Sequence, residues 1–247
     1  MHIHLANQVA EQLELSCVFD HRGSFYLGST APDIRAMTKQ PRELTHFAPL
    51  SVGKVGTGTA NMFQMHPELT EEMSPASQAF LAGYICHLAA DEVWITSVFR
   101  PNFDVSLKET RLTDNEVDAN IWDRAMQLNM DRQTLPQLPS ERHPRELLSC
   151  SDKDVSMPFF EEGLLTEWKD RVGRFMVWEF TWDRLKNALN RLYRDDDNVQ
   201  RSVEGFLERM PSSLEKLYEK IPEAEVTAYQ ERALGATISQ IREFIAD

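Results

Sequence analysis

The chain has 247 residues, of which 42% are hydrophobic and 26% are charged, as in ordinary soluble globular proteins. Its formal net charge of −13 argues against a nucleic-acid partner, because proteins that bind a phosphate backbone normally carry a basic surface. The charge does not exclude chemistry on a phosphoester, since a bound metal ion supplies positive charge of its own.

The cysteines and the N-terminus bear on where the protein works. Cys17, Cys86 and Cys150 are odd in number and lack the spacing of a metal site, so we expect no disulfide framework. No apolar run approaches the roughly 20 residues that span a bilayer. The N-terminus lacks the charged and apolar regions of a signal peptide. We therefore expect a cytoplasmic protein without a transmembrane segment.

Helices are predicted along most of the first half, because apolar residues recur at helical spacing and no strand alternation of convincing length is present. The first helix covers 4–15, and glycines and prolines break 19–33 into turns and short helical pieces. Three glycines and scattered polar residues mark 51–70 as a mobile loop. A long helix then covers 77–99, before Pro101.

The second half continues as helices separated by loops and proline-bearing joints. Its predicted helices cover 107–130, 145–150, 164–193 with Gly173 as a candidate break, 199–210, 212–220 and 223–246. The predicted fold class is therefore all-α, a multi-helix bundle with additional C-terminal helices. We expect a single domain over 1–247, in which the C-terminal helical portion (106–247) packs on a metal-site half (1–105).

Two polar residues stand out in the long helix. His87 and Asp91 lie four residues apart, on the face that carries Phe80, Tyr84 and Leu88. A histidine and a carboxylate inside an apolar stripe destabilise the fold unless they are paired. A metal ion would satisfy both side chains at once, because imidazole and carboxylate suit zinc and related ions. The alternative is a core pair in which His87 is hydrogen-bonded to Asp91.

Further polar residues lie among apolar neighbours in the first hundred positions. With the pair in the long helix they make a set of three histidines and two carboxylates: His4, Asp33, His46, His87 and Asp91. Two metal ions that share one carboxylate need about this many ligands, with water completing their shells. The set predicts a metal site if the fold brings these residues together.

Three short segments of this half also match a known pattern. They are 27–33 (Leu-Gly-Ser-Thr-Ala-Pro-Asp), 45–47 (Thr-His-Phe) and 83–91 (Gly-Tyr-Ile-Cys-His-Leu-Ala-Ala-Asp). In this order they resemble the zinc-dependent phospholipase C family, which is all-helical and related to the single-strand-specific zinc nucleases. The resemblance covers roughly the first hundred residues.

The resemblance implies a role for each matching residue. Asp33, His46, His87 and Asp91 would hold one zinc ion, and Asp91 would bridge it to a second ion served by His4. Asp33 would also orient or deprotonate the attacking water, which makes it the candidate catalytic residue. A pair of ions about 4 Å apart lowers the pKa of a bound water and neutralises the oxygens of a phosphoryl displacement.

The chain departs from the family pattern in two places. Secreted members use the amine of an N-terminal tryptophan as a ligand, whereas this chain shows Met1; His2 is either a replacement or an exposed, unpaired histidine. The family's third ion needs a histidine where this chain has Ser97, and a later His-x-x-x-Glu, for which only His143 remains. We therefore expect two ions and a missing third site, with Glu179 either a replacement carboxylate or a solvent-facing residue.

Three functions follow as hypotheses. The first is a metal-dependent hydrolase of the phospholipase C type, acting on a lipid-like or small-molecule phosphoester through a water activated by two metal ions. The second is the same scaffold with iron or manganese, in an oxidative or other non-phosphate biosynthetic reaction. The third is a non-enzymatic helical module with one structural zinc.

Overall fold

The computed structural model describes residues 1–107, 112–137, 148–149, 151–177, 179–193 and 196–245. These residues form helices joined by turns and loops, and no strand occurs among them. The prediction of an all-α fold is confirmed. Within the same part of the chain, no helix combines the length and the apolar character needed to cross a membrane.

The helices of the first half are short apart from α1 and α7. In chain order the elements are α1 (His2–Gln12), α2 (Ser16–Asp20), α3 (Arg22–Gly28), η1 (Ala31–Ile34), α4 (Arg35–Thr38), α5 (Glu43–His46), α6 (Thr57–Met65), η2 (Pro67–Thr70), α7 (Pro75–Trp94), the π-helical turn η3 (Ile95–Phe99) and α8 (Arg100–Asn102).

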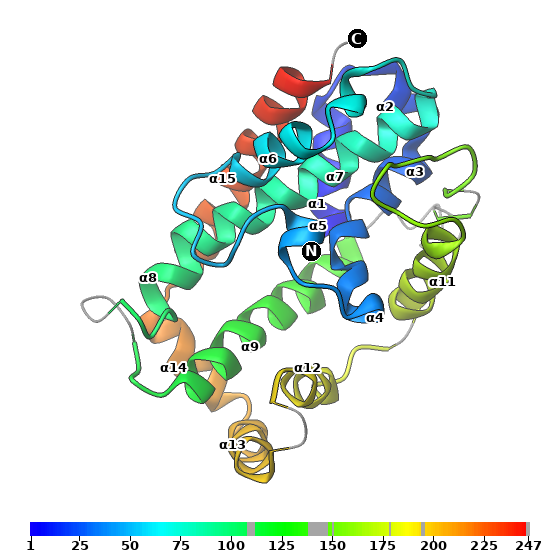
Figure 1. The fold of residues 1–247 in the computed structure, drawn as a ribbon. Coiled ribbons are helices and arrows are strands. Elements are labelled where there is room, and N and C mark those ends of the chain that lie inside the picture. The colour runs from blue at the N-terminus through cyan, green and yellow to red at the C-terminus, as the bar shows by residue number, and fades with distance from the viewer. Residues whose placement is uncertain (108–111, 138–147, 150, 178, 194–195, 246–247) are drawn as a thin grey trace.

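The helices of the second half are longer and lie mostly on one side of the first half (Figure 1). They are α9 (Glu116–Thr134), the 3₁₀ turn η4 (Leu135–Gln137), α11 (Leu164–Val177), α12 (Asp183–Tyr193), α13 (Asp197–Glu208), α14 (Ser212–Lys220) and α15 (Glu223–Phe244). Helices α12, α13 and α14 pack on α9, whereas α15 returns to lie along α7 and α1.

Helix α7 is the central element of the molecule. It starts at a well-formed cap, because the Oγ atom of Ser74 accepts a hydrogen bond from the backbone N–H of Ser77 and Pro75 occupies the first turn. Apolar residues surround almost its whole circumference, as expected of a helix buried in a core. Helices α1, α3, α6 and α15 cover it on different sides (Figure 1).

Two glycines bring the backbones of α3 and α7 into direct contact. A Cβ atom added at Gly83 would lie 2.0 Å from the carbonyl oxygen of Phe25, and one at Gly28 would lie 2.0 Å from that of Phe80. Real Cβ atoms do not approach a backbone oxygen so closely, so any side chain here forces the helices apart. Gly83, which weakens the helix as an isolated segment, is therefore explained by this close crossing.

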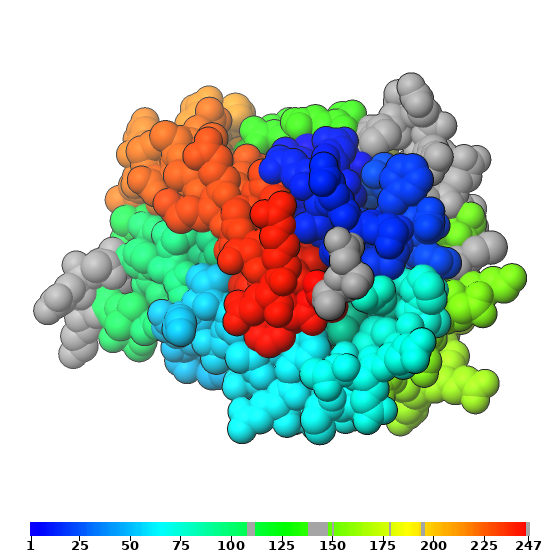
Figure 2. Space-filling view, turned by 90° about the horizontal axis from the view of Figure 1, so that it is seen from above, coloured from blue at the N-terminus to red at the C-terminus, as the bar shows by residue number. Residues whose placement is uncertain are grey.

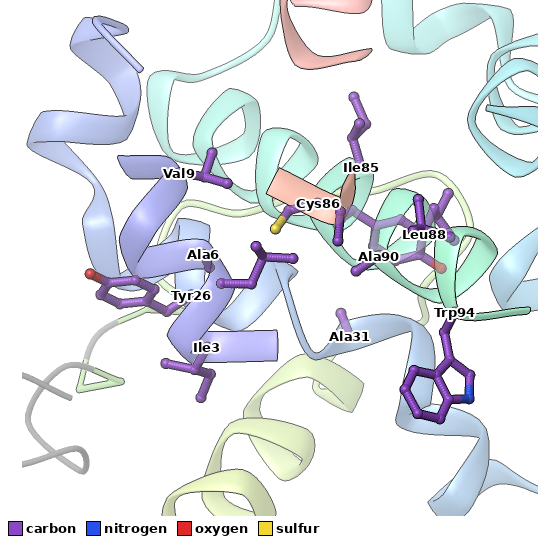
Figure 3. Close-up of a cluster of buried hydrophobic side chains, with 14 of the residues drawn as sticks. Ile3, Ala6, Val9, Tyr26, Ala31, Ile85, Cys86, Leu88, Ala90 and Trp94 are labelled. Atoms are coloured by element: carbon purple, nitrogen blue, oxygen red, sulfur yellow. The ribbon is translucent and has the colours of Figure 1, made fainter. Parts of the chain in front are cut away.

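The hydrophobic core connects the two ends of the chain. Ile3, Ala6 and Val9 project from α1 into a cluster that also holds Cys86 and Trp94 of α7 (Figure 3). In the space-filling view the C-terminal helix α15 lies directly beside the N-terminal segment (Figure 2). One cluster of buried residues thus includes side chains of both halves, in agreement with the single-domain prediction, which stays a prediction.

The prediction of a mobile loop over 51–70 is wrong. This stretch contains α6 and η2, and the carboxylate of Glu92 on α7 accepts hydrogen bonds from the backbone N–H groups of Gly56 (2.6 Å) and Gly58 (2.5 Å). A buried carboxylate therefore caps the N-terminus of α6. Gly58 has no room for a side chain, because its Cβ would lie 2.5 Å from the carbonyl oxygen of His46.

Replacing Glu92 by glutamine should lower the free energy of unfolding by about 1–3 kcal/mol, because the amide offers one acceptor oxygen where the carboxylate offers two. One buried N–H of the α6 cap would then face an NH₂ group. Urea denaturation measures the change, and Glu71→Gln, at an exposed position, is the matched control. An equal stability of the two variants would refute the capping role.

Two helix boundaries in the second half also differ from the prediction. Helix α9 starts at Glu116 rather than near 107, because the side-chain oxygen of Asn115 accepts from the backbone N–H of Val117 (2.9 Å) and caps the helix there. The predicted helix over 164–193 is broken after Val177, whereas Gly173 lies inside α11. The predicted helix over 145–150 falls mostly outside the described residues.

Candidate metal centre

His87 is held in one orientation by the crossing of α3 and α7. Its ring is buried, and its Nδ1 atom lies 2.9 Å from the carbonyl oxygen of Ser29, the residue that follows α3. A carbonyl oxygen can only accept, so Nδ1 must carry the ring proton. With this tautomer it is the Nε2 atom that offers its lone pair to a metal ion, as in histidines that bind metal ions.

His46, the last residue of α5, is oriented in a similar way. Its Nδ1 atom lies 3.0 Å from the hydroxyl oxygen of Thr45, and this hydroxyl lies 3.4 Å from the carbonyl oxygen of Arg42, to which it donates. The hydroxyl oxygen is then free to accept the Nδ1 proton. The Nε2 atom of His46 again presents a lone pair.

The two Nε2 atoms face each other at 3.3 Å. With the proton on Nδ1 of both rings, neither Nε2 atom carries a proton, so two lone pairs meet at this distance and repel. A cation between them removes the repulsion. Two nitrogens bound at 2.0–2.1 Å to one tetrahedral zinc ion are separated by about 3.3–3.4 Å. The observed spacing of His46 and His87 therefore fits a shared zinc ion.

Two carboxylates complete the cluster. The Nε2 atom of His46 lies 3.6 Å from Oδ2 of Asp91 and 3.8 Å from Oδ1 of Asp33. Asp91 comes from α7, one turn after His87, whereas Asp33 comes from η1 and has 55% of its side chain exposed. Four of the five predicted ligands thus converge from α5, α7 and η1.

The electrostatics of the site favour the protonation states that bind metal. Burial lowers the pKa of His46 well below its usual value, and the nearby guanidinium of Arg42 lowers it further against the opposing effect of Asp91. Burial alone would raise the pKa of Asp91, but Arg42 and the two histidines outweigh it and hold the pKa of Asp91 below the usual range. Near neutral pH the imidazole is neutral and the carboxylate is charged, as a metal site requires.

The structure places His2, rather than His4, at this cluster. The ring of His2 stacks on that of His87 with centroids 4.0 Å apart, and its buried Nδ1 atom has no hydrogen-bond partner among the described residues. His2, Asp33 and His87 offer ligand atoms within 4.8 Å of one another, as do His46, His87 and Asp91. His4 belongs to neither group found in the described chain.

The reason is the start of α1. Because the helix already begins at His2, His4 is rotated by about 200° around the helix axis and points away from its neighbour. The sequence left open whether His2 is a ligand or an exposed, unpaired histidine, because the predicted helix began only at residue 4. In the structure His2 reaches the site as the first residue of α1. Sequence patterns place the first residue of a helix poorly, so this position could not be predicted.

We expect His2→Asn to weaken zinc binding by about 10- to 100-fold, because the variant removes a nitrogen next to His87. His4→Asn should leave zinc affinity unchanged. Titration of the two metal-free variants with zinc, against a chelator of known affinity, compares them directly. If His4→Asn weakened zinc binding and His2→Asn did not, His4 would be the ligand, as the family resemblance implies.

Of the positions linked to a third ion, the two that the structure describes, Ser97 and Glu179, join neither candidate metal group. The hydroxyl of Ser97 in η3 donates to the carbonyl oxygen of Val93 in α7 at 2.6 Å. Glu179 is exposed and lies in neither group found among the described residues. His143 lies outside the part of the chain that the structure describes. The absence of a third site stays a prediction.

The residues of this site lie within a match to a known protein family. The model of the family described as zinc dependent phospholipase C matches residues 1–174. The chain belongs to the zinc-dependent phospholipase C family. Neither a curated protein nor a solved structure matches the chain significantly. The family match includes η1, α5 and α7, which carry the four converging ligands, and it extends through most of α11.

Helix α11 contributes to the site of this family member without offering a ligand. The indole N–H of Trp168 donates to the hydroxyl of Thr30 at 3.1 Å, directly before η1. This bond joins the second half of the chain to the segment that carries Asp33. The sequence shows no signal for this link, because Trp168 and Thr30 lie 138 residues apart.

Proposed function

We propose that the chain is a zinc-dependent hydrolase that cleaves a phosphoester of a lipid-like or small-molecule substrate. The observation that carries the proposal is the pair of Nε2 atoms, 3.3 Å apart, with the carboxylates of Asp33 and Asp91 beside them. When zinc is bound, it lowers the pKa of a coordinated water and stabilises negative charge on phosphoryl oxygens. Membership of the family supports zinc as the metal.

In this proposal the residues have distinct tasks. His46 and His87 are neutral nitrogen ligands, oriented by Thr45 and Ser29. Asp33 is the catalytic carboxylate that orients the attacking water and accepts its proton, because its side chain is the most exposed of the cluster. The family resemblance further implies a second ion bridged by Asp91, and the number of ions stays a prediction.

The site can be compared with the two alternative functions, a structural zinc and an oxidative iron or manganese centre. A structural zinc is enclosed by four protein ligands, whereas the 55% exposure of Asp33 leaves this cluster accessible to solvent on one side. Iron or manganese in an oxidative reaction suits the same donor set of imidazole and carboxylate. Zinc is favoured here because the family is defined by it. Function in the cytoplasm stays a prediction from the sequence.

The proposal is tested by removing metal from the full chain and adding back zinc, iron or manganese singly. Hydrolysis of a short-chain soluble phospholipid and of bis(4-nitrophenyl) phosphate is then measured, together with dioxygen consumption. We expect zinc to restore hydrolysis of at least one phosphodiester without dioxygen consumption. Iron-dependent dioxygen consumption without hydrolysis would favour the oxidative alternative, and metal binding with neither activity would favour the structural one.

A further inference from the structure

The site contains a cation that belongs to the chain itself. Arg42 lies directly before α5, and its Nη2 atom donates a hydrogen bond to Oδ2 of Asp91. Only 15% of the Arg42 side chain is exposed. The same residue accepts hydrogen bonds at its carbonyl oxygen from the backbone N–H groups of Thr45 (3.0 Å) and His46 (2.7 Å). The backbone of Arg42 therefore holds the segment that carries His46, and its side chain neutralises the charge of Asp91.

The described residues offer nitrogen ligands for one ion more readily than for two. The two candidate groups share His87, whose Nδ1 atom is already bonded to the carbonyl oxygen of Ser29. One remaining lone pair on His87 binds one ion. The oxygen of Asp91 that lies 3.6 Å from Nε2 of His46 is the oxygen that Arg42 contacts, so a guanidinium lies beside the carboxylate expected to bridge two ions.

We propose that Arg42 takes the place of the second metal ion, so that the chain works with one zinc ion and one guanidinium. This inference rests on the proposed function, which supplies the zinc ion held by His46 and His87. A guanidinium beside Asp91 supplies positive charge next to the zinc site, and its planar donors match phosphoryl oxygens. The Nε atom of Arg42 is buried and has no acceptor among the described residues. A phosphoryl oxygen bound beside the zinc ion would be an acceptor of the right charge for the exposed part of this guanidinium.

The first test is the number of zinc ions bound by the full chain. The metal-free protein is saturated with zinc, freed of loosely bound ions by gel filtration, and assayed by plasma mass spectrometry. We expect one ion per chain. Two or more ions would overturn the inference and leave the proposed hydrolase intact, whereas a chain without any bound ion would overturn the proposed function and the site with it.

The second test measures the binding of inorganic phosphate to the zinc-loaded chain by calorimetry. Arg42→Ala should weaken it by about 10- to 100-fold, because a charge-assisted hydrogen bond is lost, and Arg42→Lys should retain part of the affinity. Arg201→Ala on α13 is the control, since it removes the same charge from an exposed residue bonded to Asn198. Equal phosphate affinity in Arg42→Ala and Arg201→Ala would overturn the inference.

Discussion

Gly83→Ala should lower the free energy of unfolding by about 3 kcal/mol and weaken zinc binding in the same variant. The new Cβ atom would meet the carbonyl oxygen of Phe25 at 2.0 Å and the backbone nitrogen of Ser29 at 2.9 Å. These are backbone atoms of α3 and of the residue that follows it, so no side chain can rotate away. Relief requires α3 and α7 to separate, and this moves the Ser29 carbonyl that orients His87.

The matched control for this substitution is Gly235→Ala on α15. A Cβ atom at Gly235 meets nothing within 4 Å and the position is exposed, so alanine should stabilise the helix by up to about 1 kcal/mol. Urea denaturation and zinc titration of both variants separate a steric effect from a change in helix propensity. If Gly83→Ala behaved like Gly235→Ala, the close crossing would not exist in solution.

His87→Asn should weaken zinc binding by more than about 100-fold, a larger effect than the loss of a residue that only orients a ligand. The asparagine is too short to bring a donor atom to the position of Nε2, so His46 loses its nitrogen partner at 3.3 Å. Zinc content after extensive dialysis, measured per chain, gives the result. Hydrolytic activity should fall together with the zinc content.

His21→Asn provides the comparison for this variant. His21 precedes α3 and is not a member of either candidate metal group among the described residues. It should retain its zinc and its thermal stability. A His87→Asn protein that kept a full complement of zinc would exclude the site, whereas loss of zinc in both variants would indicate a general effect on folding.

Much of the site could be predicted because its signals are local. The four-residue spacing of His87 and Asp91 on a helix places both side chains on one face whatever the rest of the fold does. Asp33 and His46 entered the prediction through short motifs, and the structure brings both to that face. The helices themselves followed from apolar periodicity, and most of their boundaries needed only small changes.

The remaining features depend on contacts between distant segments. Glu92 orders the stretch after Ser51 by a contact across more than thirty residues, which the glycine-rich composition of that stretch conceals. His2 rather than His4 lies at the site because α1 begins at His2, and sequence patterns place such a boundary poorly. Arg42 showed no sequence signal, because its role arises only when α5 is packed against α7.

The most direct test of the metal centre is crystallography of the zinc-loaded chain, with anomalous diffraction recorded on both sides of the zinc absorption edge. We expect an anomalous peak about 2 Å from both Nε2 of His46 and Nε2 of His87, with carboxylate oxygens of Asp33 and Asp91 around it. A zinc peak elsewhere in the molecule, with the two imidazoles still facing each other and nothing between them, would contradict the account.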